Sequence, residues 1–261
     1  MPRSGRIDPS SGGGLTPIAS AYPPTPMKIR HCLALLLLGA VSAFAAETAP
    51  APLTKLPLTG FKPLFNGKDM KGWHWSRTVR HGSVGGFRIE GGAMTLFQNP
   101  YGQGGLLMTD KRYKNFEFYV ETDIQPFYNS GLFLRSSESG YAYQLELTGG
   151  QSTTDLMVES LKPLSAQGRT TRFAELWNPN GWNSVRVRMV GDDPLITCWL
   201  NDVQLWEVQV NNAQIAGETD GFIGLQLHWT APTSEAGSSM ALTSWKPNGA
   251  LRFRNLFIKE L

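Results

Sequence analysis

Short runs in which apolar and polar side chains alternate dominate the chain from residue 61 onward. In residues 116–124, for example, Phe116 and Phe118 alternate with Glu117 and Tyr119. Such alternation is typical of antiparallel strands with one face on a core, and no segment after residue 45 sustains helical periodicity. Repeated over about 200 residues, the pattern predicts an all-β fold, a jelly-roll β-sandwich in a single domain. Further runs lie at 185–189, 196–200, 203–210, 221–229 and 251–259, with a hairpin expected at Asn201-Asp202.

The first 45 residues have the character of an export leader. A short basic start at 27–31 precedes a Leu-rich apolar run at 32–41, and small residues follow at positions 43 and 45. This order is typical of a secretory signal peptide, and the apolar run is short for a membrane span. We therefore predict an exported protein, periplasmic or secreted, with no membrane span after cleavage. The expected divisions are an upstream segment with signal peptide (1–45), a linker (46–59) and a β-sandwich domain (60–261).

The positive charge of the chain belongs to this leader. The 261 residues carry a formal net charge of +3, with a pI near 8.9. Cleavage after Ala45 removes four basic residues and one acidic residue and leaves 20 of each. A neutral chain without a Lys/Arg run excludes a nucleic-acid partner and suits an uncharged ligand.

Three of the expected strands place polar side chains opposite their apolar residues. If these strands are neighbours in one sheet, the polar residues form a cluster with an acid, a base and amides. Such a cluster suits the hydroxyl groups of a sugar, and Phe133 or Trp229 could offer an apolar ring. Other interpretations are a solvated sheet face, a structural role for His228, and a cross-strand pair of Arg135 with Glu146. The polar residues are Asn129 and Arg135, Gln144 and Glu146, and Gln226 and His228.

Familiar catalytic motifs do not occur in the chain. It contains no G-x-S-x-G, Walker loop, dinucleotide fingerprint or Cys/His metal box. His74 and His81 lie in a Trp/Gly-rich segment without metal-ligand spacing, and we expect them at the surface. Cys198 alternates with apolar neighbours, so a buried, inert thiol is expected.

An ordered set of short motifs resembles a known family. The family is the 3-keto-disaccharide hydrolase domain, also described as a 3-keto-glucoside 1,2-lyase / 3-keto-2-hydroxy-glucal hydratase domain. The match covers residues 60 to 261, and its specificity lies in the order of the motifs. They are LFNGKDMKGW (64–73), FRIEGG (87–92), GLL (105–107), YKNFE (113–117), NSGLFLR (129–135), Gly140-Tyr141 with Gln144, GWN (181–183), WLN (199–201), GLQLH (224–228) and LRFRNLFIK (251–259).

The resemblance implies a concanavalin A-like sandwich and an exported bacterial enzyme that cleaves 3-keto-glycosides. A ketone at C3 acidifies the C2 proton, so a base can remove it while the C1 substituent leaves by β-elimination, with or without hydration of the product. His228 or Glu146 would be the base, with Asn129 and Arg135 holding the sugar or stabilising the enolate. A divalent metal among His228 and carboxylates is left open, as is the oligomeric state. The expected site comprises His228 and Glu146 as catalytic residues and Asn129, Arg135, Gln144 and Gln226 as substrate-binding residues.

The sequence departs from the family pattern in two places. The usual acids of the Gln144 strand are replaced by Ala142 and Leu147, which puts acid/base chemistry in doubt unless Glu146 substitutes. Residues 231–249 form an insertion, expected as a lid or an edge decoration. The lost acids support an alternative, a non-catalytic carbohydrate-binding or cell-surface module on the same fold. A β-glucanase is a weaker third reading, because the chain lacks an E-x-D-x-x-E pattern.

Overall fold

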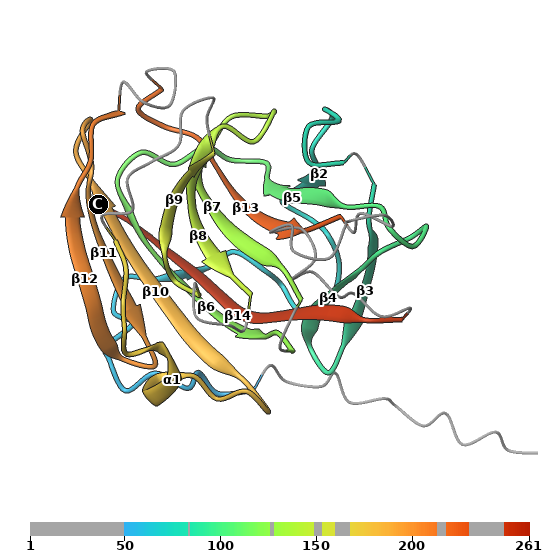
Figure 1. Ribbon diagram of the computed structural model, residues 1–261, viewed down its shortest axis with the longest axis horizontal. Coiled ribbons are helices and arrows are strands. Elements are labelled where there is room, and N and C mark those ends of the chain that lie inside the picture. The colour runs from blue at the N-terminus through green and yellow to red at the C-terminus, as the bar shows by residue number, and fades with distance from the viewer. Residues whose placement is uncertain are drawn as a thin grey trace, which may run out of the picture. The chain divides into compact units, whose positions relative to one another are not determined.

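The computed structural model describes residues 50–82, 84–125, 128–148, 153–159, 168–212, 218–229 and 248–261 (Figure 1). These residues belong to one compact unit, which runs from Ala45 to Leu261. The predicted leader and nearly all of the predicted insertion lie outside the described residues. In the described part of the chain, no helix is long and apolar enough to cross a membrane.

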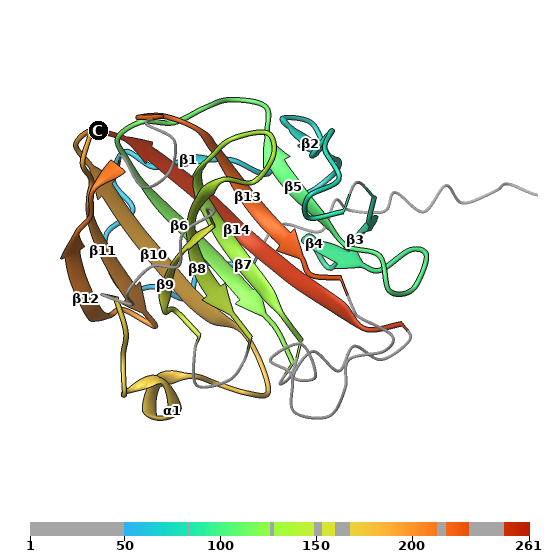
Figure 2. The ribbon, with the colours of Figure 1, turned by 45° about the horizontal axis from the view of Figure 1, so that its top comes forward.

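Two antiparallel sheets form the fold, as the alternation predicted (Figures 1 and 2). Within the described residues, one sheet has eight strands and the other has six. The only helix in this part is a single turn, α1 (Phe173–Leu176). The larger sheet runs in the order β12 (Val203–Gln209), β11 (Leu195–Leu200), β10 (Asn183–Val190), β6 (Phe116–Asp123), β14 (Ala250–Glu260), β4 (Ala93–Phe97) and β3 (Gly86–Glu90), with β1 (Lys62–Pro63) paired to β14. The smaller sheet runs in the order β2 (Trp73–Trp75), β5 (Gly105–Thr109), β13 (Phe222–Leu227), β7 (Ser130–Ser136), β8 (Ala142–Leu147) and β9 (Leu156–Glu159).

The core fills the space between the inner faces of the two sheets. Phe118 and Val120 of β6 are fully buried there with Leu225 of β13 and Leu145 of β8. Their polar neighbours in sequence point to the outer faces, because successive side chains of a strand alternate between faces. The predicted jelly-roll β-sandwich of the concanavalin A-like type is confirmed, and so is the burial of Cys198. Burial raises the pKa of the Cys198 thiol, which keeps it in the unreactive protonated form.

The expected hairpin at Asn201-Asp202 is confirmed. It joins the antiparallel strands β11 and β12, and both of its residues have positive φ, 47° and 68°. Two-residue hairpin loops of this kind favour Asn and Asp, which tolerate the left-handed region. Asp202 also accepts a hydrogen bond from the Lys55 backbone N–H at 2.7 Å. The predicted linker is thus hydrogen-bonded to the domain at Lys55.

Candidate functional site

The outer face of the smaller sheet, here called the open face, combines an apolar patch with polar side chains. The patch consists of buried residues that β5, β7 and β8 turn away from the main core, and the partly buried Phe222 of β13 packs against it. The inner phase of the same strands, including Leu107 and Leu132, faces the core. The division into a core face and an open face that was predicted for β7, β8 and β13 is therefore correct at these positions, and β5 follows the same division. The buried patch residues are Leu106, Met108, Phe133 and Ala142.

Gln144, Glu146 and Gln226 meet on the open face, as their strand phase predicted. The Gln144 Nε2 donates to Glu146 Oε2 at 2.9 Å and to Gln226 Oε1 at 3.4 Å. All three side chains are buried. Gly131 of β7 leaves room for this contact, because a Cβ there would lie 2.5 Å from the Gln144 Nε2. With its Nε2 engaged, Gln144 keeps a buried Oε1 that has no hydrogen-bond partner in the described structure.

Asn129 and His228 border this cluster. Asn129 lies directly before β7 and hydrogen-bonds the Glu146 carboxyl, while its buried Oδ1 has no partner within the described residues. His228 follows β13 directly, and its Nδ1 lies 2.6 Å from the Trp229 carbonyl oxygen. Since a carbonyl can only accept, Nδ1 carries the proton and Nε2 keeps a free lone pair. Burial lowers the pKa of His228, which favours this neutral form.

The pKa of Glu146 is shifted toward neutral pH. Burial raises its pKa to about 7, and the nearby carboxylates of Glu159 and Asp155 act in the same direction. The hydrogen bond from Asn129 opposes the shift without cancelling it. A carboxyl with such a pKa can donate a proton as well as accept one near pH 7.

Replacing Glu146 by Gln is expected to stabilise the protein at high pH only. The pKa of Glu146 rises from an ordinary 4.5 to about 7 on folding, so between these pH values the folded protein binds more protons than the unfolded chain. Its stability therefore falls as pH rises through this window. E146Q should match the wild type near pH 4 and exceed it by up to about 3 kcal/mol above pH 7. Urea unfolding from pH 4 to 8 measures the difference, and a constant offset would contradict the shifted pKa.

Arg135 does not join the cluster, so its predicted place on the open face is wrong. Its backbone is left-handed, with φ 49°, and the pairing of β13 with β7 shifts register beside it. This bulge breaks the alternation on which the prediction rested. The fully buried guanidinium donates instead to the carbonyl oxygens of Lys114 and Gly191, each at 2.8 Å. Arg135 therefore ties the chain before β6 to the turn after β10.

His81 and Glu159 also border the open face, where no sequence pattern had placed them. The expectation that His81 lies at the surface is wrong, since its side chain is only 11% exposed and packs edge-on against Phe133. Glu159 is the last residue of β9 and pairs in register with Ala142. Leu156 and Val158 share the buried phase of β9, but a strand of four residues is too short for its outward Glu159 to be predicted from alternation. The position of His81 depends on a loop and carries no periodic signal.

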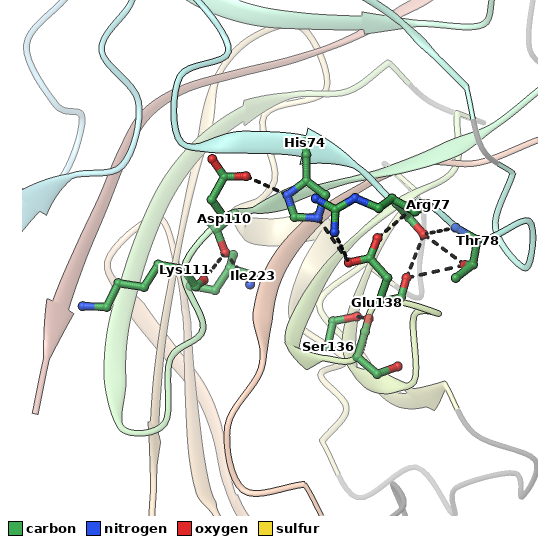
Figure 3. A network of polar contacts seen from close by, with 11 residues as sticks. His74, Arg77, Thr78, Asp110, Lys111, Ser136, Glu138 and Ile223 are labelled. Carbon is green, nitrogen blue, oxygen red and sulfur yellow. Dashed lines mark hydrogen bonds and ion pairs between the residues drawn. The ribbon is translucent and has the colours of Figure 1, made fainter.

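The loop that carries His81 is anchored through Glu138 (Figure 3). The Glu138 carboxylate accepts from the Arg77 backbone N–H at 2.7 Å. The backbone carbonyl oxygen of Glu138 accepts from the Ser76 hydroxyl, also at 2.7 Å. His74 is also largely buried, contrary to expectation. Its ring nitrogens lie 2.8 Å from Asp110 Oδ1 and 3.3 Å from Glu138 Oε2. These contacts bind the loop after β2 to the turn between β7 and β8.

Replacing Glu138 by Ala is expected to loosen this loop. The variant loses the acceptor for the Arg77 N–H and one partner of His74, and each such hydrogen bond is worth about 1 kcal/mol. Amide hydrogen exchange in residues 76–82 should accelerate by about tenfold or more, while the strands of the core stay protected. Glu175→Ala, at an exposed position of α1, is the matched control. Unchanged exchange in E138A would show that other contacts hold the loop.

The two positions where family acids are missing have different environments. Leu147 is fully buried in the main core, so its position does not belong to the open face. The missing acid at this position therefore removes no carboxylate from that face. Ala142 does lie on the open face, opposite Glu159. The open face thus retains carboxylates from Glu146 and Glu159 despite both departures.

Two other kinds of site are not supported where the chain is described. No group of three or more His, Cys, Asp or Glu side chains within the described ranges could hold a metal ion, so these residues do not fit the metal that we left open. A cavity of about 330 Å³ lies away from the cluster, among residues that include Glu90, Asp123 and Arg252. Its carboxylates are neutralised by arginines, Asp123 by Arg252 and Glu90 by Arg88. Glu146 and His81, whose pKa values burial shifts strongly, lie at the open face instead.

Comparison with known proteins agrees with this architecture. The sandwich and its open face define a concanavalin A-like domain of the kind also found in glycosyl hydrolase structures. An inferred glycosyl hydrolase from Parabacteroides distasonis is 22% identical, with a TM-score of 0.51, over 77% of this chain and 94% of that one. A second inferred glycosyl hydrolase from that organism is 17% identical, with a TM-score of 0.45, over 77% and 99% of the two chains. At 22% identity the likeness to the first structure concerns the fold alone.

The sequence identifies the family to which the chain belongs. Residues 60–259 match the model of the 3-keto-alpha-glucoside-1,2-lyase-like domain, and the chain belongs to this family. The resemblance drawn from the ordered motifs is thereby confirmed. No curated protein matches the sequence.

Proposed function

We propose that the protein cleaves glycosides whose sugar is oxidised at C3, by β-elimination with or without hydration of the product. Family membership supports the substrate class. The observation that carries the proposal is the buried cluster of Glu146, Gln144 and Gln226 with its unfilled acceptors. The buried oxygens Gln144 Oε1 and Asn129 Oδ1 need hydrogen-bond donors, and sugar hydroxyl groups supply them.

The elimination assigns complementary tasks to His228 and Glu146. The neutral His228 ring takes the C2 proton at Nε2, and the C1–O bond breaks as the C1=C2 double bond forms. The protonated fraction of Glu146, whose pKa is about 7, gives its proton to the departing oxygen. Arg135 points away from the cluster and cannot stabilise the enolate oxygen, as we had expected it to do. The amide N–H groups of Asn129 and Gln226 stabilise this oxygen instead.

Turnover of matched substrates tests this function. The mature protein is incubated with a 3-keto-glucoside and with its unoxidised parent, each with and without a chelator. We expect release of the aglycone from the keto sugar alone. Binding of plain glycans without turnover of either compound would instead establish the alternative, a carbohydrate-binding module. The shifted pKa of Glu146 favours the enzyme, because a binding face gains nothing from a carboxyl poised near neutrality.

We also propose that the protein is exported. The proposal rests on the basic, apolar and small-residue order of positions 27–45. Expression of the full chain in a Gram-negative host should yield a periplasmic protein whose N-terminus is Ala46. A cytoplasmic product that begins at Met1 or Met27 would contradict export.

A further inference from the structure

His81 and Glu159 lie side by side, and the elimination uses neither of them. The Glu159 Oε2 also accepts from Arg80 Nη2 at 3.3 Å. The His81 Nε2 lies 4.0 Å from Glu159 Oε2, and it is a buried nitrogen without a hydrogen-bond partner among the described residues. The ring is held edge-on against Phe133, with 5.1 Å between the ring centroids. Gly140 packs under the imidazole, since a Cβ at this position would lie 2.3 Å from His81 Cδ2. Packing and a hydrogen bond to the Gly140 backbone therefore fix the ring, and its buried Nε2 faces Glu159.

This pair lies within electrostatic range of the groups assigned to the elimination. Glu159 is among the causes that raise the pKa of Glu146, and His228 is among those that lower the pKa of His81. The two pairs nevertheless come from different parts of the fold. Glu146 lies on β8 in the sheet itself, whereas His81 lies on the loop after β2 that Glu138 anchors (Figure 3). A sugar between sheet and loop would have titratable groups on two sides.

We propose that His81 is the general base that activates water in the hydration half of the reaction, with Glu159 as its positioning residue. The inference rests on the proposed function. Water gives a proton to His81 Nε2 as its oxygen bonds to C1 of the unsaturated sugar. The C1=C2 electron pair moves to C2, which takes a proton from His228 after the proton on its Nε2 has exchanged with solvent. The product is the 3-keto sugar with a hydroxyl at C1, and solvent returns the proton on His81 to Glu146, which lost one to the aglycone.

The protonation of His81 and the charge of Glu159 suit this task. Burial lowers the pKa of His81 to about 4, with Arg80 acting in the same direction, so its ring is in the basic form at neutral pH. Glu159 then stabilises the positive charge that develops as the ring accepts a proton. Glu146 is less available for this step, because Gln144 and Asn129 hydrogen-bond its carboxyl group.

Separate measurement of the two half-reactions tests the proposal. Aglycone release reports elimination, and the ultraviolet absorbance of the conjugated enone reports the unsaturated sugar that awaits hydration. In H81Q we expect hydration to fall by about 10²- to 10⁴-fold, so that the unsaturated sugar accumulates while aglycone release continues. E159Q should lower hydration by about tenfold, a smaller loss in keeping with one charged neighbour. Free imidazole should restore hydration in H81A, whose cavity can admit it.

Several outcomes would overturn the proposal. H81F retains an aromatic ring against Phe133, so it serves as the second variant if H81Q or H81A does not fold, as judged by thermal unfolding. An equal fall of both half-reactions in the folded variants would make His81 a binding or structural residue. Hydration at the wild-type rate in H81Q would exclude a catalytic role while leaving the proposed function intact. If the wild type releases no aglycone from any 3-keto-glucoside, the proposed function fails, and this inference fails with it.

Discussion

H228A is expected to lose aglycone release from a 3-keto-glucoside by about 10²- to 10⁴-fold, the usual contribution of a positioned base. His228 provides a neutral ring whose Nδ1 proton is fixed by the Trp229 carbonyl at 2.6 Å. E146Q should suffer a similar loss, because an amide cannot donate the proton that the leaving oxygen needs. In the wild type, kcat should decline above pH 7, as Glu146, with a pKa of about 7, loses its proton.

The controls separate chemistry from folding. E146Q is expected to be at least as stable as the wild type above pH 7, so its inactivity there could not be attributed to unfolding. Glu90 is an exposed carboxylate that pairs with Arg88 on the larger sheet, and E90Q should keep wild-type turnover. Full activity in H228A would show that our assignment of the site is wrong. A loss in E90Q as large as in E146Q would remove the case for the open face.

R135M is expected to destabilise the protein by about 1–3 kcal/mol for each of the two carbonyl oxygens that lose their donor. The substitution keeps much of the side-chain volume but leaves the carbonyl oxygens of Lys114 and Gly191 without their donor. Acceptors that are partly shielded from water are costly to leave without a donor, because water replaces the lost hydrogen bond only in part. The loss should appear as a lower midpoint of urea unfolding.

Arg169 supplies the matched control for this experiment. Its side chain is largely exposed and lies 3.3 Å from Asp155, so R169M should change stability by no more than about 0.5 kcal/mol. A variant R135M with wild-type stability and greatly reduced turnover would return Arg135 to the site. The position of Arg135 therefore distinguishes a structural arginine from a substrate-binding one.

Much of the fold follows from a local rule that the sequence displays. Side chains alternate along β6, β10 and β13, so the buried and outward residues of these strands could be predicted. The same rule placed Gln144, Glu146 and Gln226 together, and their hydrogen bonds confirm that they meet. A small error in the strand ends does not alter such a prediction, because the phase decides the face.

The rest depends on features that alternation does not contain. At Arg135 a left-handed backbone and a register shift turn the side chain away from the face that its phase predicts. At His81 the position follows from a loop held by contacts across more than 50 residues of sequence, through Glu138 and Gly140. Glu159 ends a strand of four residues, too short for a strong periodic signal. Bulges and anchored loops therefore complete a site whose centre the strands define.

The origin of the proton at C2 tests elimination most directly. The wild-type protein is given a 3-keto-glucoside in D₂O, and the released 3-keto sugar is analysed at early times by mass spectrometry and NMR, against the free sugar incubated without enzyme. Cleavage through elimination and hydration predicts one deuterium at C2 in the enzymatic product, or an unsaturated sugar that lacks the C2 hydrogen. A product that retains its original hydrogen at C2 would mean direct hydrolysis at C1 and would contradict the mechanism proposed for His228 and Glu146.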